Sequence, residues 1–417
     1  MCMRDLVARG KRSAPADAPR SGAGVCLCRR GWFRATGRRS AATREAVLNR
    51  ASGKEKNYLN QGCTVSRHTT WVVLSDGARP TEDIYFLASA ASGLRRRGVA
   101  VERFTASRSF GASWVHGRSL LRRFAGANLL LCRSLPLGWL RWLERHRDAF
   151  GYIAYLIDDD IFAASNDPTL PAAYRKRMGG IAKHQPRLVS LADEVVASSE
   201  QLARCFFSEH DNVQVLTPPL ITPLPSLQHF SQPPSSSANW KIGFYGTRAH
   251  LADLMHIAPA IEGMQSQRMD TQVEIMLGPH TPESLITLPR LNAPCPLAWE
   301  AFKVYQREHR CHIGLAPLLN TPFNHGKSFI KFFDITAMGG VGIYSNRYPY
   351  TEIVQHGKNG LLVNDAHVEW RSALEHLLEN PIAAANMAKQ AAVDAKRIGN
   401  VEAAVQFWLK RSGAVPQ

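Results

Sequence analysis

At 417 residues and 46.2 kDa, the chain is too long for one ordinary hydrophobic core and has the length of two domains. Its 45% hydrophobic and 20% charged residues exclude a chain that is disordered throughout, and no run of 18 apolar residues predicts a transmembrane helix. The net charge of +17 would favour a nucleic-acid-binding protein, but residues 1–65 hold eleven Arg and three Lys against four acids, or +10 of that charge. We therefore expect nucleic acid not to be a partner of the rest of the chain.

Residues 1–65 are predicted to form a disordered basic extension. They are rich in Arg, Gly, Ser and Ala, and they have too few large apolar residues to offset the entropy of ordering the chain. No apolar stretch of the length of a signal-peptide core follows the first basic residues, which argues against a secretory signal. Two alternatives stay open: an organellar transit peptide, and a basic arm that contacts nucleic acid or anionic lipid.

Residues 66–220 alternate short apolar runs with longer amphipathic ones. Strands are predicted at 70–74, 99–104, 128–132, 152–157, 194–197 and 213–216, and helices at 84–97, around 189–192, and at 199–207. This alternation is typical of a parallel sheet that helices cover on both faces. We therefore predict a doubly wound, Rossmann-like domain of the α/β class.

A second domain follows a linker. Pro and Ser are concentrated at 217–239, and we place the linker at 221–240. In 241–417, strands are predicted at 241–245, 272–277, 311–316, 341–345 and 360–363, and helices at 251–264, 329–338, 368–378, 381–396 and 401–411. Two doubly wound domains bind ligands at the carboxyl ends of their strands, so we expect those ends to border one cleft.

Four segments of the sequence carry a family signal when they are taken together. GFYGT at 243–247 opens the second domain, and NHGKSFIKFFD at 324–334 with AMGGVGI at 337–343 follows later; YLIDDDIF at 155–162 and ADEVVASSEQLA at 192–203 lie in the first domain. In this order and spacing they resemble the GT-B fold glycosyltransferases of group 1, the family-four-like enzymes. The resemblance covers about residues 70–411 of the chain.

The resemblance implies an enzyme that moves a sugar from a nucleotide-diphosphate-sugar donor to a glycan, lipid-linked or small-molecule acceptor, with retention of configuration. The donor is then a co-substrate of 241–417, and 66–220 form the acceptor side. It further implies a place in surface polysaccharide or glycoconjugate biosynthesis, in the cytoplasm or peripherally at the inner face of the membrane. The family commonly has two glutamates eight positions apart; here Gly326 holds the first position, which contacts the sugar, and Asp334 the second, which holds the ribose.

The donor site is predicted from small and cationic residues. Gly246 and Thr247 lie where a strand meets a helix, and small residues there let backbone N–H groups approach a phosphate. Lys327 and Lys331 lie near one predicted helix start, where two cations suit a diphosphate. Asp334 falls in an apolar helix and needs a partner, which is a ribose diol, a lysine or a backbone amide.

The other donor candidates also have ordinary structural explanations. Arg248 and His250 can add hydrogen-bond donors at the strand–helix turn, or His250 can cap it. Gly339 and Gly340 allow a close approach of backbone to ligand, although a helix C-cap also explains at least one of them. The two lysines can likewise form a solvated basic face.

Three adjacent carboxylates, Asp158, Asp159 and Asp160, end a predicted strand of the first domain. They fit a Mg²⁺ or Mn²⁺ site, or an acceptor-side cluster that orients hydroxyl groups and supplies a catalytic acid or base. We favour the second interpretation because of the resemblance. The eight cysteines form no CxxC pair and have no zinc-ligand spacing, so we expect a reducing compartment and no metal cofactor.

Two further features of the first domain are ambiguous. The loop at 76–78 follows the first strand and, in the resembling family, borders the reaction centre. Trp114, Trp139 and Trp142 lie in a region rich in Arg, which fits contact with anionic lipid or a lipid-linked acceptor, or else an aromatic core with snorkelling arginines.

Three alternative functions stay open. The chain can be a degenerate GT-B protein that binds nucleotide sugars without turnover, which Gly326 motivates. It can be a nucleotide-sugar epimerase, because one fold hosts several reactions. It can bind nucleic acid through residues 1–65.

Overall fold

The computed structural model describes residues 70–109, 111–231 and 239–413. The predicted basic extension at 1–65 lies outside these residues, as does part of the predicted linker. Residues 61–417 form one unit that contains both sheets. No helix in the described part of the chain is both long enough and apolar enough to cross a bilayer.

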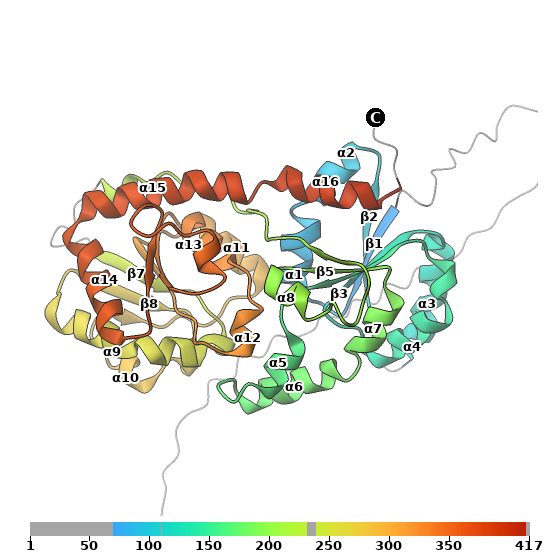
Figure 1. Ribbon diagram of the computed structural model, residues 1–417, viewed down its shortest axis with the longest axis horizontal. Helices are drawn as coiled ribbons and strands as arrows, with labels where there is room; N and C mark the ends of the chain where they lie inside the picture. Colours follow the sequence, from blue (N-terminus) through green and yellow to red (C-terminus); the bar gives the residue numbers. More distant parts are fainter. Residues whose placement is uncertain (1–69, 110, 232–238, 414–417) are drawn as a thin grey trace, which may run out of the picture. The chain divides into compact units, whose positions relative to one another are not determined.

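The first sheet has six parallel strands in the order β2-β1-β3-β4-β5-β6 (Figure 1). Their bounds are β1 Thr70–Ser75, β2 Ala100–Thr105, β3 Asn128–Cys132, β4 Ile153–Ile157, β5 Glu194–Ala197 and β6 Val213–Val215. Every residue of β3, β4 and β5 is buried, since helices cover both faces of the sheet. This burial explains why these central strands stand out in the sequence as short runs rich in apolar residues.

The helices of the first domain differ more from the prediction. They are α1 Arg79–Glu82, α2 Ala91–Arg96, α3 Ala112–Phe124, α4 Leu137–Arg145, α5 Ile161–Asn166, α6 Ala172–Ala182, α7 Gln185–Leu191 and α8 Glu200–Arg204, with a π-helical turn η2 Asp83–Leu87 and a 3₁₀ turn η3 Arg147–Ala149. The single helix predicted at 84–97 is wrong, because the π-helical turn and a break at 88–90 interrupt it. Helices α3 to α6 were not predicted, although Leu120, Leu121 and Phe124 of α3 pack against the core at helical spacing.

The second sheet repeats the scheme with six parallel strands in the order β12-β11-β10-β7-β8-β9. Their bounds are β7 Trp240–Phe244, β8 Thr271–Ile275, β9 Leu291–Asn292, β10 Ile313–Ala316, β11 Val341–Ser345 and β12 Leu361–Val363. The predicted fold class, two doubly wound parallel sheets with flanking helices, is therefore confirmed. The two-residue edge strand β9 is too short to leave a pattern in the sequence.

The helices of the second half of the chain agree better with the prediction. They are α9 Leu251–Gln267, α10 Glu283–Ile286, α11 Trp299–Glu308, α12 Pro322–His325, α13 Ile330–Ala337, α14 His367–Glu379, α15 Pro381–Ile398 and α16 Val401–Arg411, with 3₁₀ turns η4 Gln228–Phe230, η5 Arg248–His250, η6 Gly278–His280 and η7 Tyr350–Glu352. Of these, α10, α11 and α12 were not predicted.

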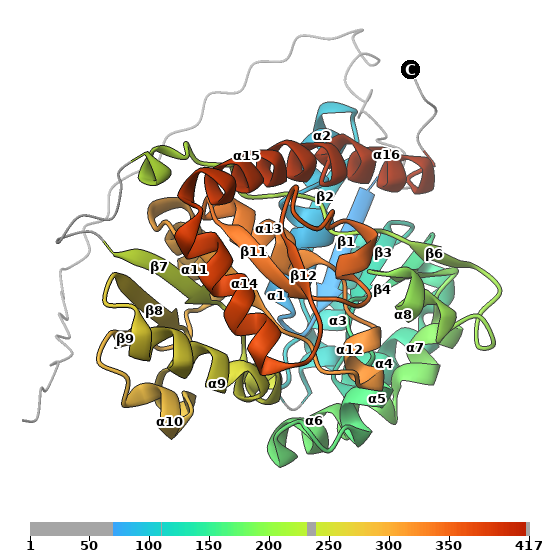
Figure 2. The same ribbon diagram turned by 60° about the vertical axis from the view of Figure 1, so that its left-hand side comes forward.

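The last helix packs against the first sheet rather than the second. Figures 1 and 2 both show α16 beside α2. Its Trp408 is fully buried, with ring centroids 5.3 Å from Trp71 and 5.0 Å from Phe86, and its indole N–H donates to the Tyr85 carbonyl at 2.8 Å. The predicted domain 241–417 included this helix. The sequence does not show that the chain returns to the first domain, because an amphipathic pattern predicts that one face of a helix is buried and not which surface covers it.

Candidate active site

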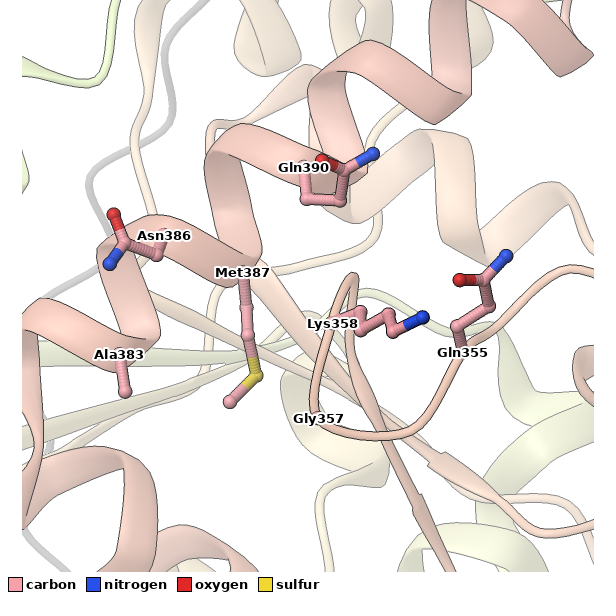
Figure 3. A pocket seen from close by; sticks show the side chains of 7 residues that line it. All are labelled: Gln355, Gly357, Lys358, Ala383, Asn386, Met387 and Gln390. Carbon is pink, nitrogen blue, oxygen red and sulfur yellow. The ribbon is translucent and has the colours of Figure 1, made fainter.

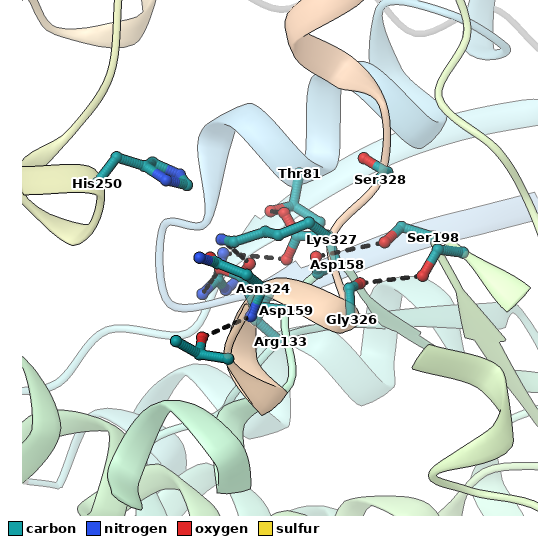
Figure 4. Close-up of polar contacts among 12 residues, drawn as sticks. Thr81, Arg133, Asp158, Asp159, Ser198, His250, Asn324, Gly326, Lys327 and Ser328 are labelled. Carbon is teal, nitrogen blue, oxygen red and sulfur yellow. Dashed lines mark hydrogen bonds and ion pairs between the residues drawn. The ribbon is translucent and has the colours of Figure 1, made fainter. Parts of the chain in front are cut away.

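A cluster of charged side chains lies where β4 ends. Asp158 and Asp159 follow its last residue, and Arg133 follows the last residue of the neighbouring strand β3. Arg133 Nη1 lies 3.0 Å from Asp158 Oδ1 and Nη2 lies 2.9 Å from Asp159 Oδ2 (Figure 4). Arg133 has a φ of 58°, a left-handed conformation that residues other than glycine rarely adopt. The backbone therefore turns sharply at the point where the guanidinium meets both carboxylates.

The second domain contributes the other cation of this cluster. Lys327 Nζ lies 2.6 Å from Asp159 Oδ1, and the ammonium also lies 4.1 Å from the centroid of the Phe323 ring. The lysine side chain is 16% exposed and the Asp159 side chain 12%. A mostly buried ion pair therefore joins the acid-bearing edge of the first sheet to the segment that precedes α13.

The two adjacent carboxylates have opposite electrostatic environments. Burial alone would raise the pKa of Asp159, but the Lys327 ammonium and the Arg133 guanidinium outweigh burial and lower that pKa to about 2. For Asp158, burial dominates and raises the pKa, although Arg133 and a 2.7 Å hydrogen bond from the Thr81 hydroxyl oppose it. Neighbouring groups with divergent pKa values are suited to different roles, so Asp158 is the member that can take up a proton.

Asp160, the third predicted acid, has a structural role. Its Oδ1 accepts a hydrogen bond from the Ala163 N–H at 2.8 Å and so caps the start of α5. A Cβ atom at Gly326 would lie 3.2 Å from the Asp160 Cβ, and the Gly326 carbonyl accepts a 2.9 Å hydrogen bond from Ser199. A larger side chain at position 326 would press on Asp160, which gives a packing reason for the glycine where the resembling family has glutamate.

Most of the predicted donor-site residues meet at the carboxyl end of β7. Lys331 Nζ donates to the Tyr245 carbonyl at 2.5 Å and lies 2.8 Å from Asp334 Oδ2. Gln306 donates to the other carboxylate oxygen of Asp334 at 2.8 Å. Because Gly246 follows Tyr245 directly, Lys331 lies beside the predicted phosphate turn. The partners of Asp334 in this structure are Gln306 and Lys331, and a lysine is one of the three kinds of partner that the sequence left open.

The turn after β7 is shaped by its glycine. A Cβ atom at Gly246 would lie 2.6 Å from the Phe244 ring, so this position accepts no side chain without movement of that ring. Thr247 precedes the 3₁₀ turn η5, and α9 begins at Leu251, directly after the last residue of η5. The start of a 17-residue helix therefore lies close to the Lys331 ammonium, which is the arrangement that favours an anion.

His250 connects this turn to α12. Its Nδ1 lies 2.8 Å from Asp253 Oδ2, and because a carboxylate only accepts, Nδ1 carries the proton. Burial lowers the pKa of His250, and the nearby ammonium charges of Lys327 and Lys331 lower it further. Asp253 also accepts from the Asn324 amide at 3.0 Å. The imidazole is thus held neutral, with Nε2 left as an acceptor.

The structure does not bring three of the predicted donor residues to this group. The side chain of Arg248 is exposed. Gly339, with a φ of 79°, and Gly340 end α13: the Gly340 N–H donates to the Ile335 carbonyl at 3.1 Å, and both glycines precede the first residue of β11. They lie at the amino end of that strand, whereas the other candidates lie at carboxyl ends. The helix C-cap explains Gly339, and close packing explains Gly340, where a Cβ atom would lie 2.7 Å from Cys311 Sγ.

Several residues of the site were missed at the sequence level. They are Thr81, Arg133, Asp253, Gln306 and Asn324. Arg133 had a usable signal, because it follows a buried strand directly, as Asp158 does. Asp253 lies only three residues after its partner His250, and Asn324 lies within the 324–334 segment that carries the family signal, so both also had a signal. Thr81 and Gln306 had none, since their contacts come from parts of the chain far apart in sequence. Asn324 Oδ1 is buried without a hydrogen-bond partner among the described residues.

The two ambiguous features of the first domain are resolved by packing. Asp76 accepts a hydrogen bond from Ser134 at 3.1 Å and pairs with Arg108, which holds the 76–78 loop beside the end of β3. Trp139 and Trp142 are core residues, whereas Trp114 is 69% exposed. The interpretation as aromatic core is therefore correct for two of the three tryptophans.

A pocket of about 590 Å³ lies elsewhere, between α15 and the loop before β12 (Figure 3). It is lined by Gln355, Gly357, Lys358, Ala383, Asn386, Met387 and Gln390. None of the predicted site residues borders it. Among the described residues, no group of three or more His, Cys, Asp or Glu side chains is arranged to hold a metal ion.

Comparisons with known proteins identify the architecture. The sequence matches no protein-family model and no curated protein sequence. Among solved structures, it is similar to a sucrose-phosphate synthase from Thermosynechococcus elongatus (13% identity, 82% of this chain and 97% of that one, TM-score 0.61). It is also similar to Anabaena HepE in complex with UDP-glucose (13% identity, 83% and 100%, TM-score 0.56), and to a glycosyltransferase from Rickettsia africae (10% identity, 82% and 97%, TM-score 0.53). The paired parallel sheets and these likenesses together show that the chain has the GT-B fold.

Proposed function

We propose that the protein is a glycosyltransferase that uses a nucleotide-diphosphate sugar as its donor. The observation that carries this proposal is the group formed by Lys331, Asp334 and the Gly246–Thr247 turn at the start of α9. Cationic side chains and a helix start at the carboxyl edge of a Rossmann-like sheet are the usual surroundings of a nucleotide phosphate. The UDP-glucose bound to the structurally similar Anabaena HepE supports this class of donor.

In this proposal, the second domain stabilises the leaving group. The bond from the anomeric carbon to the diphosphate oxygen breaks, the diphosphate departs with the bonding electrons, and an acceptor hydroxyl attacks that carbon from the face that the diphosphate leaves, which retains the anomeric configuration. The ammonium groups of Lys331 and Lys327 stabilise the negative charge that develops on the leaving diphosphate. Neutral His250 presents Nε2 as an acceptor for a sugar hydroxyl.

The first domain handles the acceptor. The raised pKa of Asp158 makes its carboxylate a stronger base, and we assign it the proton of the attacking hydroxyl. Asp159 stays ionised and holds Lys327 in place. We further propose retention of anomeric configuration, and a role in building surface polysaccharide or glycoconjugate at the cytoplasmic face of a membrane.

The first test is a screen of the full chain for thermal stabilisation by UDP, GDP, ADP, CMP and their sugar conjugates, with and without Mn²⁺. A donor at a concentration a hundred times its Kd stabilises the folded state by about 2.7 kcal/mol, so the unfolding midpoint is expected to rise by several degrees. Stabilisation by no member of the panel would contradict the proposal. Thermal stabilisation that depends on Mn²⁺ would support the alternative interpretation of Asp158–Asp160 as a metal site.

One observation favours a second candidate, a protein that binds nucleotide sugars without turnover. Gly326 stands where the resembling enzymes have a glutamate that contacts the sugar, and Asp160 packs against it. The same samples distinguish the two candidates. Release of free nucleotide from a stabilising nucleotide sugar, with or without an acceptor, supports the enzyme, whereas stabilisation with no release supports the binding protein.

We also propose that α3 rests on an anionic bilayer. Residues 103–143 contain no Asp or Glu, and α3 exposes Trp114 (69%) and Val115 (65%). At 3.6 residues per turn, these two side chains share a stripe about 100° wide with Arg118 and Arg122. Neither arginine has an acidic partner within the described residues. Exposed apolar side chains among unpaired arginines are typical of helices that lie in a membrane interface.

Vesicle sedimentation tests this contact. The Arg118→Glu/Arg122→Glu variant is expected to bind vesicles of phosphatidylcholine and phosphatidylglycerol roughly thirtyfold more weakly than the wild type, since each basic residue near such a surface adds about 1 kcal/mol. Brominated lipid is expected to quench the fluorescence of the wild type more than that of Trp114→Phe, which keeps an apolar side chain but lacks the indole. Equal binding by the wild type and the charge variant would refute the contact.

A further inference from the structure

A basic helical hairpin, α5–α6, adjoins the charged cluster and has no role in the function proposed so far. The segment 168–192, which contains α6, holds five Lys and Arg residues and no Asp or Glu. Arg187 pairs with Glu144. The other four, Arg175, Lys176, Arg177 and Lys183, have no acidic partner within 4 Å among the residues that the structure describes.

The first turn of α6 reaches the cluster through an edge-to-face aromatic contact. The Tyr174 ring centroid lies 6.4 Å from that of Phe323, and the Lys327 ammonium lies 4.1 Å from the Phe323 centroid. Burial raises the pKa of Tyr174, and the negative charge of Asp159 raises it further, which places the phenol within electrostatic reach of that carboxylate. The basic residues that follow Tyr174 therefore begin beside the site and continue away from it.

Two details show that this surface is arranged for a ligand. Arg175 Nε is buried and has no hydrogen-bond partner among the described residues, which costs free energy unless something else accepts from it. Phe162, in the first turn of α5 and two residues after Asp160, is 69% exposed. Because α5 packs against α6, the exposed ring on α5 offers a stacking face for a sugar ring, and the unpaired cations of α6 offer a countercharge for an acidic group.

We propose that the acceptor is an anionic glycan, one that bears phosphate, sulfate or carboxylate groups, and that α6 binds its charged groups while its terminal sugar enters the site. This inference rests on the proposed glycosyltransferase function, because it names the acceptor of the same reaction. The acid-free run of 25 residues is the observation that selects an anion over a neutral acceptor. Phe162 and Tyr174 would orient the sugar between the anion contacts and Asp158.

The test measures fluorescence anisotropy of the full chain with a labelled dextran sulfate oligosaccharide and with a neutral dextran oligosaccharide of the same length. The variant Lys176→Glu/Arg177→Glu removes exposed charges of α6 and is expected to bind dextran sulfate roughly tenfold more weakly than the wild type. The matched control is Arg118→Glu/Arg122→Glu, which makes the same charge change on α3. It is expected to bind within twofold of the wild type, and the extension at 1–65 contributes equally in all three proteins.

Vesicles that contain phosphatidylglycerol separate a glycan anion from a lipid phosphate. The α6 variant is expected to keep its vesicle binding while the α3 variant loses it, the reverse of the result with dextran sulfate. The inference is overturned if the α6 variant binds dextran sulfate as the wild type does, if both variants lose equally, if neutral dextran binds as tightly, or if only vesicle binding falls. Stabilisation by nucleotides, measured on the same variants, reports on the donor site separately, so its absence would count against the proposed function and not against α6.

Discussion

Replacing Lys327 with methionine is expected to lower the free energy of unfolding by about 3–5 kcal/mol, because it leaves the Asp159 carboxylate buried beside a single cation. Lys327 Nζ lies 2.6 Å from Asp159 Oδ1, and both side chains are less than one-fifth exposed. Methionine keeps the length and the contact with the Phe323 ring, so the change removes the charge and little of the packing. Urea denaturation at neutral pH, followed by tryptophan fluorescence, gives the measurement.

The double variant Lys327→Met/Asp159→Asn is the control for this result. Removal of both members of a buried pair is far less harmful than removal of one, so the second change is expected to restore most of the lost stability. Arg133 then keeps its pair with Asp158 at 3.0 Å. Equal stabilities for the single and double variants would show that the ion pair does not carry the loss.

The Lys327–Asp159 ion pair also determines how the free energy of unfolding changes at acid pH. The pKa of Asp159 is lowered to about 2, below its value in the unfolded chain, so its contribution is present above about pH 4 and is lost as the pH falls toward 2. Asp158 has a raised pKa and acts in the opposite sense: its contribution is present below the unfolded pKa and is lost as the pH rises through the folded value. In Asp159→Asn, the decline of stability between pH 4 and pH 2 should be shallower than in the wild type.

The fold was predictable wherever burial leaves a pattern along the chain. Strands such as β3 and β4 are covered on both faces, and their sequences, NLLLC and IAYLI, are short apolar runs. Helix α3 also carries such a pattern, since Leu120, Leu121 and Phe124 recur at helical spacing and pack against the core, but our prediction missed it. The packing of α16 on the first sheet was unpredictable, since its partner lies more than 300 residues away in sequence.

The members of the candidate site were easier to predict than their pairing. Asp158, Asp159 and Lys327 each stood out by residue type and position. The contact between Asp159 and Lys327, which are 168 residues apart in the sequence, exists only in the fold. Gly339 and Gly340 were assigned to the donor site because a helix C-cap and a phosphate loop make the same demand for glycine, and the structure places them between α13 and the first residue of β11. Spacing in the sequence therefore identifies candidate site residues. The end of the strand at which each one lies then shows which of them can meet at one site.

Replacing Lys331 with glutamine is expected to weaken binding of the stabilising nucleoside diphosphate roughly ten- to hundredfold, the loss of one charge-assisted contact with a phosphate. Glutamine can still donate to the Tyr245 carbonyl or to Asp334, which the lysine contacts at 2.5 Å and 2.8 Å, so the local fold is preserved. Titration calorimetry measures the affinity, and the variant's unfolding midpoint without nucleotide confirms that it is folded.

Two further variants separate the role of this ammonium from a general effect of charge. Lys241→Gln removes an exposed lysine of β7 in the same domain and is expected to leave affinity within twofold of the wild type. Lys331→Arg keeps the positive charge beside the start of α9 and should recover part of the lost affinity. If Lys331→Gln binds the nucleotide as tightly as Lys241→Gln does, then Lys331 serves only to neutralise Asp334, and the phosphate must be held by the backbone of the β7–α9 turn and by Lys327.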